Sequence, residues 1–432
     1  MNHIHQPQVA SRRSFLKTSA VLTGAAAAQM VIPRAVRAAG SDAIRVGLVG
    51  CGGRGSGAAA QALSADKGVI LTGLADAFRD QATRTLGSLK EQFKDRVSAT
   101  PDQCFVGFDS FKQLIASDVD VVLLCSPPHF RPAHLKAAVE AGKHIFTEKP
   151  MAVDAPGVRS AMATVEEAKK KNLAIVAGFC WRYHDAHRPT FARVHDGVIG
   201  DVQTVYSYYN AGGLWVKPRK PEWSDMEWQI RNWLYFTWLS GDHLVEQAVH
   251  SVDKVAWAMK DVPPVRAMGW GGRQVRTDPA YGHIYDHFAV VYEWENGARA
   301  HVYCRQQDGT AGGVWDHITG TKGVCTLNSG QVHQVKPYGG PEWKFEGEAR
   351  NMYQVEHDEL FASIRAGKPI NDGDRMMNST MMAIMGRMAT YTGLRITWEQ
   401  AMNSKEDLTP PSYEWGPIAT PPVAMPGKTK FL

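Results

Sequence analysis

Residues Arg45–Gly57, R-V-G-L-V-G-C-G-G-R-G-S-G, decide the fold of this chain. The apolar, β-branched residues 44–49 predict a buried strand, and the alanine-rich residues 58–63 predict a helix. A glycine-rich turn joins the two. Strand, glycine turn and helix in this order are typical of a dinucleotide site, because the helix N-terminus offers free N–H groups to a pyrophosphate.

Each glycine of the turn has a physical role. Gly50 permits a tight turn, Gly52 lets the backbone approach a pyrophosphate, and Gly55 lets the helix pack closely on the strand. We therefore assign the turn to the cofactor, with candidate contacts from Gly50, Gly52, Gly53, Arg54 and Gly55.

A second apolar run, residues 69–75, ends in Asp76. This is the distance downstream at which a carboxylate meets the adenosine ribose hydroxyls. A carboxylate there repels a 2′-phosphate, so Asp76 favours NAD. Arg54 and Arg79 are close enough in sequence to keep NADP open.

Residues 1–39 resemble an export signal rather than part of the fold. Residues 11–17, S-R-R-S-F-L-K, have the twin-arginine pattern, and an alanine-rich run with small residues follows. Twin-arginine export carries folded proteins, so we expect a periplasmic or otherwise exported protein that leaves the cytoplasm with its nucleotide bound. A membrane anchor is the alternative, but the run is shorter than the ~20 residues that a span needs. No anchor is therefore expected.

Charge and cysteine content exclude two classes of function. The formal net charge of +5 comes from residues 1–39, which hold five Lys or Arg and no Asp or Glu, so the rest of the chain is neutral. A neutral protein lacks the basic surface that nucleic acid needs, and no nucleic-acid partner is expected. The six cysteines are scattered without a C-x-x-C pair, which predicts buried thiols rather than disulfides or a metal centre.

Three further apolar runs predict parallel strands that deliver polar residues to one sheet edge. Residues 119–125 lead to Ser126-Pro127-Pro128-His129, residues 143–146 to Thr147-Glu148-Lys149-Pro150, and residues 173–179 to Cys180-Trp181-Arg182-Tyr183. Open α/β sheets bind ligands at the carboxyl ends of their strands. The cofactor assignment therefore extends to Ser126, Pro127, His129, Glu148 and Lys149.

The second half of the chain has a different pattern. Alternating or Val- and Tyr-rich runs predict an antiparallel sheet, with strands at 202–209, 266–270, 286–294, 298–305 and 323–327. Helices are predicted at 246–257, 353–366 and 376–392, the last rich in methionine, which indicates core packing. The fold class is α/β plus α+β: an N-terminal Rossmann doubly wound parallel sheet, then a domain on a large, mostly antiparallel sheet. The expected segments are a signal (1–39), a Rossmann domain (40–182), a substrate domain (183–405) and a proline-rich arm (406–432) over the surface or a neighbouring subunit.

Several motifs resemble the Gfo/Idh/MocA family of glucose–fructose oxidoreductases and inositol dehydrogenases. They are the glycine turn, Pro127-Pro128 followed by His134, the run 141–150 (A-G-K-H-I-F-T-E-K-P) and Val198-Ile199-Gly200. The resemblance covers most of residues 43–400. It implies that Lys149 contacts the substrate hydroxyl and the nicotinamide ribose, and that an acid four residues before a histidine supplies proton transfer.

That second motif corresponds to Glu246 and His250, which at helical spacing share one face. The family's acid is usually Asp, followed by Gly two positions before the histidine, whereas this chain has Glu246 and Ala248. The chemistry is consistent without the resemblance, because hydride removal from a carbinol needs a base, and an imidazole suits that task. A lysine beside a cationic nicotinamide would have its pKa lowered and would hydrogen-bond the developing alkoxide.

Further polar and aromatic residues suit a sugar or polyol, which needs a ring face and hydrogen-bonding groups. The candidate substrate contacts are Arg182, Tyr183, Trp233, Asp242 and His243, with ordinary packing as the alternative for each. His283 and His287 have metal-like spacing but flank a strand start, so no metal is assigned.

Two functions of different classes follow. The first is an NAD(P)-dependent oxidoreductase acting on a sugar, polyol or sugar derivative. An exported protein meets no soluble nicotinamide pool, so its NAD must be tightly bound and recycled in place. The alternative is an NAD-dependent, redox-neutral glycoside hydrolase or lyase, in which oxidation, elimination driven by His250 or Tyr183, water addition and reduction close a cycle. A sugar-binding protein with an inactive Rossmann site is a third possibility, which the intact motifs disfavour. We expect a homo-oligomer, a dimer or tetramer, since one face of the second sheet needs covering.

Overall fold

The computed structural model describes residues 42–328 and 332–432. The predicted twin-arginine signal, residues 1–39, lies outside these residues. Within the part of the chain that is described, no helix combines the length and hydropathy needed to cross a bilayer.

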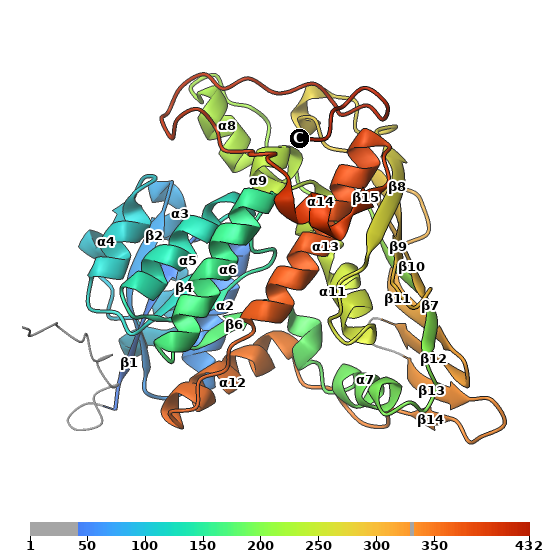
Figure 1. Cartoon of the computed structure of the whole chain (residues 1–432). Coiled ribbons are helices and arrows are strands. Elements are labelled where there is room, and N and C mark those ends of the chain that lie inside the picture. The colour runs from blue at the N-terminus through green and yellow to red at the C-terminus, as the bar shows by residue number, and fades with distance from the viewer. Residues whose placement is uncertain (1–41, 329–331) are drawn as a thin grey trace, which may run out of the picture. The chain divides into compact units, whose positions relative to one another are not determined.

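The first sheet has six strands, all parallel, in the order β3-β2-β1-β4-β5-β6 (Figure 1). The strands are β1 (Ile44–Val49), β2 (Val69–Asp76), β3 (Cys104–Val106), β4 (Val121–Leu124), β5 (His144–Thr147) and β6 (Ile175–Ala177). The order reverses between β1 and β4, which is where a doubly wound sheet opens a crevice at its carboxyl edge. The predicted Rossmann fold is confirmed.

Helices α2 (Gly53–Ala65), α3 (Arg79–Phe93), α4 (Ser110–Ala116), α5 (Arg131–Glu140) and α6 (Ala155–Lys170) connect these strands. Another helix, α12 (Met352–Arg365), packs against α2 although it follows the second sheet in the chain (Figure 1). It buries Val355, Leu360 and Phe361. The cover of the first sheet is thus completed by a segment that the sequence analysis placed in the substrate domain.

The second sheet has nine strands in the order β14-β13-β12-β11-β7-β10-β9-β8-β15. They are β7 (Val202–Ala211), β8 (Arg266–Gly272), β9 (His287–Glu293), β10 (Arg299–Gln306), β11 (Gly313–Gly320), β12 (Gly323–Asn328), β13 (His333–Pro337), β14 (Trp343–Lys344) and β15 (Ile396–Thr397). Only the β7–β10 pair is parallel among the pairs described. The predicted mostly antiparallel sheet is confirmed.

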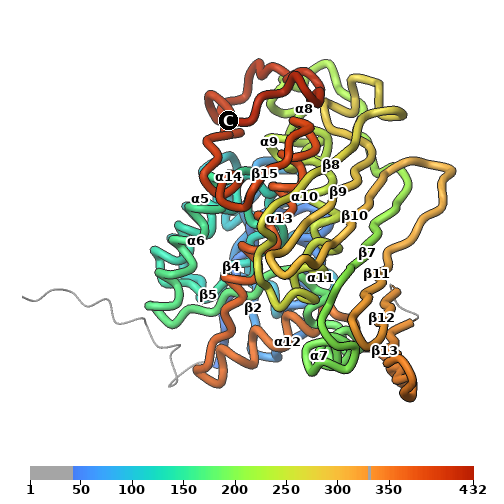
Figure 2. Tube along the Cα trace, turned by 45° about the vertical axis from the view of Figure 1, so that its right-hand side comes forward, coloured from blue at the N-terminus to red at the C-terminus, as the bar shows by residue number. Residues whose placement is uncertain are grey.

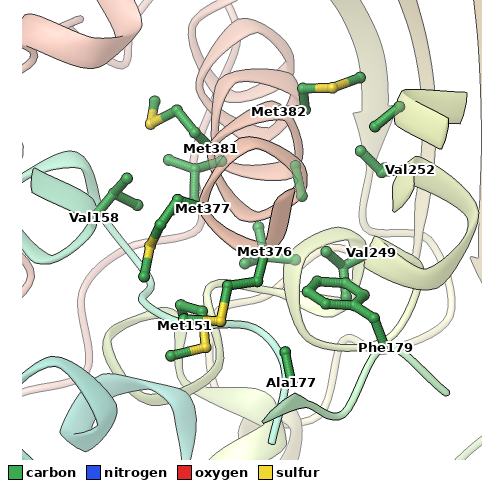
Figure 3. Packing of buried hydrophobic residues seen from close by; sticks show 14 of the residues in the cluster. Met151, Val158, Ala177, Phe179, Val249, Val252, Met376, Met377, Met381 and Met382 are labelled. Atoms are coloured by element: carbon green, nitrogen blue, oxygen red, sulfur yellow. The ribbon is translucent and has the colours of Figure 1, made fainter. Parts of the chain in front are cut away.

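The methionine-rich helix α13 (Gly373–Thr392) joins the two halves of the core (Figure 3). It contacts α6 and β6 of the first domain and α11 (Val249–Ala258) and β8 of the second. Met376, Met377, Met381 and Met382 are buried, with Met151 and Val158 on one side and Phe179, Val249 and Val252 on the other. Methionine here is core packing, as predicted, and its flexible side chain suits an irregular junction.

The predicted helix 246–257 is interrupted. Helix α10 (His243–Glu246) ends in a wide turn, where the Ala248 N–H donates to the His243 carbonyl at 2.9 Å, and α11 begins at Val249. Glu246 and His250 therefore belong to different helices, and one helical face does not account for their proximity. The other helices are α7 (His187–His195), α8 (Asp225–Arg231), α9 (Thr237–Ser240) and α14 (Trp398–Asn403).

The proline-rich arm, residues 406–432, crosses the surface of its own chain over α8 and α9 (Figure 2). The Met226 N–H donates to the Gly416 carbonyl at 3.1 Å, and the Gln229 amide donates to the Ile418 carbonyl at 3.2 Å. The arm ends against α14, where Ser404 Oγ donates to the Leu432 carbonyl at 2.6 Å. All six cysteines are free thiols and five are buried, as predicted.

Candidate active site

The glycine turn has the geometry that a pyrophosphate needs. Gly50 has φ +92°, and a Cβ there would lie 2.5 Å from the backbone of Cys125 and Ser126. A Cβ at Gly55 would collide with the Gly50 carbonyl, whereas at Gly52 and Gly53 nothing lies within 4 Å. The first and last glycines are thus required by packing, and the middle two leave the N-terminus of α2 open to an anion, which fits a dinucleotide.

Asp76 lies at the end of β2 and holds the turn in place. Its carboxylate accepts the Cys51 N–H at 2.6 Å and the Phe78 N–H at 2.8 Å. Burial raises its pKa above the ordinary value, against these two hydrogen bonds. The carboxylate is therefore fixed beside the turn, at the position where a ribose would lie.

A cavity of about 710 Å³ runs along the carboxyl edge of the first sheet and reaches residues of the second domain. Thirteen of the predicted site residues line it: Gly50, Gly52, Gly53, Arg54, Gly55, Asp76, Ser126, Pro127, Glu148, Lys149, Trp233, Glu246 and His250. The nucleotide residues and the proposed proton-transfer residues therefore share one cavity.

Arg54 is the half-buried member of an ion pair rather than a free cation. Its guanidinium binds the Glu148 carboxylate, reaches Glu356 of α12 at 3.3 Å and stacks on the Tyr353 ring at 4.9 Å. Arg79 does not line the cavity. The two arginines that kept NADP open in the sequence analysis thus present no unpaired guanidinium at Asp76.

Glu148 and Glu356 are held in opposite protonation states. Burial alone would raise the pKa of Glu148, but Arg54 brings it below the ordinary value. Burial and the neighbouring Glu148 raise the pKa of Glu356 well above its ordinary value. Because two carboxylates share one arginine here, we infer that Glu148 is ionised and Glu356 is a neutral acid. The sequence analysis missed Glu356, which lies on the helix from the far end of the chain.

Lys149 and Glu246 meet across the two domains. Lys149 follows β5, and its Nζ donates to the backbone carbonyl of Glu246 at the end of α10. Burial raises the pKa of the Glu246 carboxyl to about 7, against the lowering effect of Lys149. A carboxyl with this pKa exchanges protons readily near neutral pH.

His250 is a buried neutral imidazole. Burial lowers its pKa well below the ordinary value, and the charge of Lys149 lowers it further. Its Nδ1 is buried and has no hydrogen-bond partner among the described residues. Because Nδ1 is inaccessible, the part of the neutral ring that lines the cavity is the part able to exchange a proton with a ligand there.

Four predicted substrate contacts, Arg182, Tyr183, Asp242 and His243, do not line the cavity. Arg182 is 4% exposed and its guanidinium binds Asp253 at 2.8 Å and Asp261 at 2.6 Å. The Tyr183 hydroxyl donates to Asp372 at 2.7 Å. A buried guanidinium needs carboxylate partners, and both side chains serve the core instead of a ligand.

Asp242 and His243 have structural positions as well. The Asp242 carboxylate caps α10, accepting the His243 N–H at 2.5 Å and the Tyr285 N–H at 2.8 Å. Burial lowers the pKa of His243 to about 3. His129, predicted at the cofactor, is likewise absent from the cavity lining, because its Nε2 bonds Tyr413 of the arm at 2.7 Å.

Some cavity residues had no sequence signal. Arg131 is buried and bridges two loops of the sheet edge, donating to the Ser126 carbonyl at 2.7 Å and the Pro150 carbonyl at 2.6 Å. Lys217 and Arg231 reach the Asp76 end from a segment far along the chain. In the sequence, Arg131 at a helix start and Lys217 in a loop are typical of surface residues. Only the fold shows that they line the cavity.

The parallel sheet, the open glycine turn and the shared cavity define a dinucleotide-binding enzyme fold with a second, substrate-facing domain. Residues 44–179 match the model of an oxidoreductase family with an NAD-binding Rossmann fold, and residues 190–326 match the GFO/IDH/MocA C-terminal domain. These two models together span more than half of the chain, which belongs to the Gfo/Idh/MocA family.

Individual relatives have low sequence identity to this chain. The chain is 27% identical over 191 residues to a dTDP-3,4-didehydro-2,6-dideoxy-alpha-D-glucose 3-reductase of Actinomadura kijaniata, covering 44% of this chain and 51% of that protein. It is 25% identical over 242 residues to a 2,7-anhydro-N-acetylneuraminate hydratase of Escherichia coli, covering 55% and 59%. The chain thus spans about half the length of these curated relatives.

Among solved structures, an aldose-aldose oxidoreductase from Caulobacter crescentus, complexed with glycerol, aligns with a TM-score of 0.64 at 20% identity. The alignment covers 82% of this chain and 99% of that one. At this identity the match shows the fold alone.

Proposed function

We propose that the protein is an NAD(P)-dependent oxidoreductase acting on a sugar, polyol or sugar derivative. The observation that carries the proposal is the single cavity, which holds a dinucleotide turn and Asp76 at one end and Lys149, Glu246 and His250 at the other. The relatives named for sugar chemistry support the substrate class.

The bound nicotinamide supplies the hydride acceptor or donor. Lys149 is held by the Glu246 carbonyl, which leaves its other two N–H groups for a substrate oxygen. His250, a neutral imidazole that lines the cavity, takes the hydroxyl proton. Glu246, whose pKa is about 7, lies beside Lys149 and lines the same cavity as His250, so it exchanges protons with the same ligand. The ammonium of Lys149 favours the negative charge that develops on oxygen.

We further propose that the cofactor is NAD, tightly bound and recycled in place. The Asp76 carboxylate, which lines the cavity, favours NAD over NADP. The arm supports tight binding, because Trp415 packs on Phe78 and Phe108 with ring centres 5.4 and 4.6 Å apart, and both phenylalanines line the nucleotide end of the cavity. These contacts hold Phe78 and Phe108 in place at the nucleotide end of the cavity.

Two proposals concern the location and assembly of the protein. The twin-arginine pattern supports export to the periplasm. An aromatic face on the second sheet supports a homo-oligomer: Tyr208 stacks on Trp315 at 3.9 Å, and Trp270 is 54% exposed. Exposed aromatic patches of this kind mark interaction surfaces.

The second candidate is redox-neutral glycoside cleavage by the same residues. The hydratase among the relatives supports it. Oxidation of a ring hydroxyl acidifies the neighbouring C–H, and His250 is placed to take that proton before the aglycone leaves, water adds and the hydride returns. Tyr183, considered for this step from the sequence, is bound to Asp372 outside the cavity.

Absorbance at ~340 nm distinguishes these candidates. The full chain, purified without added NAD, is treated with free sugars and then with aryl glycosides. Reduction by a free sugar that lasts until a second carbonyl compound is added supports the oxidoreductase. Phenol release over many turnovers with a nicotinamide band that returns to its starting value supports glycoside cleavage. If no sugar or glycoside changes the band of NAD-loaded protein, both are wrong.

A further inference from the structure

Three buried histidines from separate elements converge away from the active-site cavity. His184 follows the turn 180–183, His187 begins α7 and His333 begins β13. Their side chains are 8%, 1% and 7% exposed, and one ring nitrogen of each lies within 4.8 Å of the others. None of the three lines the cavity. Neither the sequence spacing nor the proposed reaction accounts for this cluster.

The ring nitrogens have the spacing of ligands around one ion. His187 Nδ1 is 3.2 Å from His184 Nδ1 and 3.0 Å from His333 Nε2. Two imidazole nitrogens at 2.0–2.1 Å from a tetrahedral Zn²⁺ are about 3.3 Å apart. The observed spacing is close to this value.

A proton or a cation can partner these nitrogens. His184 Nδ1 accepts the Ala186 N–H at 3.2 Å, and one proton on His187 Nδ1 would join that ring to His333 Nε2. A cation at the centre would replace this proton and turn the His184 lone pair from the Ala186 N–H to the ion.

The surroundings favour neutral ligands. All three rings are buried, and a metal binds the neutral form of an imidazole. Lys254 lies near the cluster, with its ammonium 5.4 Å from the Trp181 ring that packs on His184 and His187. Its ammonium is bound to the buried Asp316 carboxylate, which offsets that charge.

We propose that His184, His187 and His333 bind one divalent late first-row metal ion, with Zn²⁺ as the natural occupant. Three imidazoles with no carboxylate select zinc, nickel or copper over magnesium or calcium. No fourth side chain joins the cluster in the described residues, so a water completes the coordination. The ion links β13, near one end of the second sheet, to α7. Its role is structural, and the proposal does not rest on the proposed function.

The test uses the full chain, stripped with a chelator and titrated with Co²⁺ and Zn²⁺. We expect one equivalent of Co²⁺ with visible ligand-field bands, displacement by Zn²⁺, and a higher melting temperature with Zn²⁺. His184→Gln, His187→Gln and His333→Gln should each weaken binding by more than the 10–100-fold that outer-shell groups contribute. His301→Gln, on the second sheet outside the cluster, is the matched control and should bind as the wild type does.

Equal Co²⁺ binding by the wild type and all three variants would overturn the proposal. If the variants do not fold, the wild-type titration decides: a stripped protein that shows neither the Co²⁺ bands nor a Zn²⁺-dependent melting shift has no such site. Nicotinamide absorbance is unaffected by either result, so failure here is separate from failure of the proposed function.

Discussion

The Glu246 carboxyl provides the sharpest test of the active-site electrostatics. Burial raises its pKa from 4.5 to about 7, so the folded protein holds a proton there that the unfolded chain has released. Between pH 4.5 and pH 7 the native state binds more protons than the unfolded state, so the free energy of unfolding falls as pH rises. Above about pH 7 the carboxyl is ionised in the native state too, and the free energy of unfolding does not fall further on its account.

Glu246→Gln removes this titration. One pKa unit corresponds to ~1.4 kcal/mol, so the wild type should lose about 3 kcal/mol relative to the variant between pH 4.5 and pH 7. With an unfolding entropy of about 2.1 cal/mol/K per residue, this is a relative shift of about 4 °C in melting temperature. The diagnostic quantity is the change in the difference between the two proteins, because a constant offset only reports altered packing.

The assay is thermal unfolding of cofactor-free protein from pH 4.5 to 8.5, followed by tryptophan fluorescence. Glu348→Gln, at an exposed position, controls for the loss of one carboxylate. Bound NAD⁺ adds positive charge to the cavity, so it should move the transition to lower pH. A difference between wild type and Glu246→Gln that stays constant across this range would refute the assigned burial and with it the acid–base role near neutral pH.

Three further predictions concern the site and its support. Lys149→Met should lower kcat about 100- to 1000-fold with little change in cofactor absorbance, because it removes a hydrogen-bond donor to the developing alkoxide; Lys136→Met on α5 is the control, and equal rates for both would exclude the assigned role. Arg182→Leu leaves Asp253 buried without its cation and should cost about 3–5 kcal/mol, whereas Arg350→Leu at an exposed pair should melt almost as the wild type does; equal melting of these two variants would contradict a buried pair. Trp415→Ala loses two aromatic contacts of about 0.5–1.5 kcal/mol each and should release NAD several-fold faster in a dilution assay. Tyr338→Ala, at an exposed turn, is its control, and unchanged release from Trp415→Ala would show that the arm does not hold the cofactor.

Local patterns were sufficient for the nucleotide half of the protein. Strand, turn and helix around Gly50 follow from hydrophobicity and backbone sterics within a few residues, and Asp76 follows from chain spacing. Lys149 follows from its place after β5. All of these features depend on neighbours in sequence, which is why they were found.

The substrate half was less predictable, because long-range pairing decides it. Arg182 and Asp242 looked like ligands on composition alone, yet Asp253 neutralises the first and the N-terminus of α10 binds the second. Strand β11 was missed, since its glycines and the inward Asp316 weaken the expected alternation, and Asp316 is tolerated inside only because Lys254 lies opposite. Glu356 was not predicted as a site residue, because its helix, α12, follows the second sheet in the chain yet packs against α2 of the first domain.

The arm has a consequence for the order in which the protein is made. The glycine turn and Asp76 emerge early during translation, but the aromatic wall over Phe78 and Phe108 is supplied by Tyr413 and Trp415, which are added hundreds of residues later. Until then Phe78 and Phe108 lack these partners. If the arm slows release as proposed, a cofactor bound before the arm docks would be retained once it has docked.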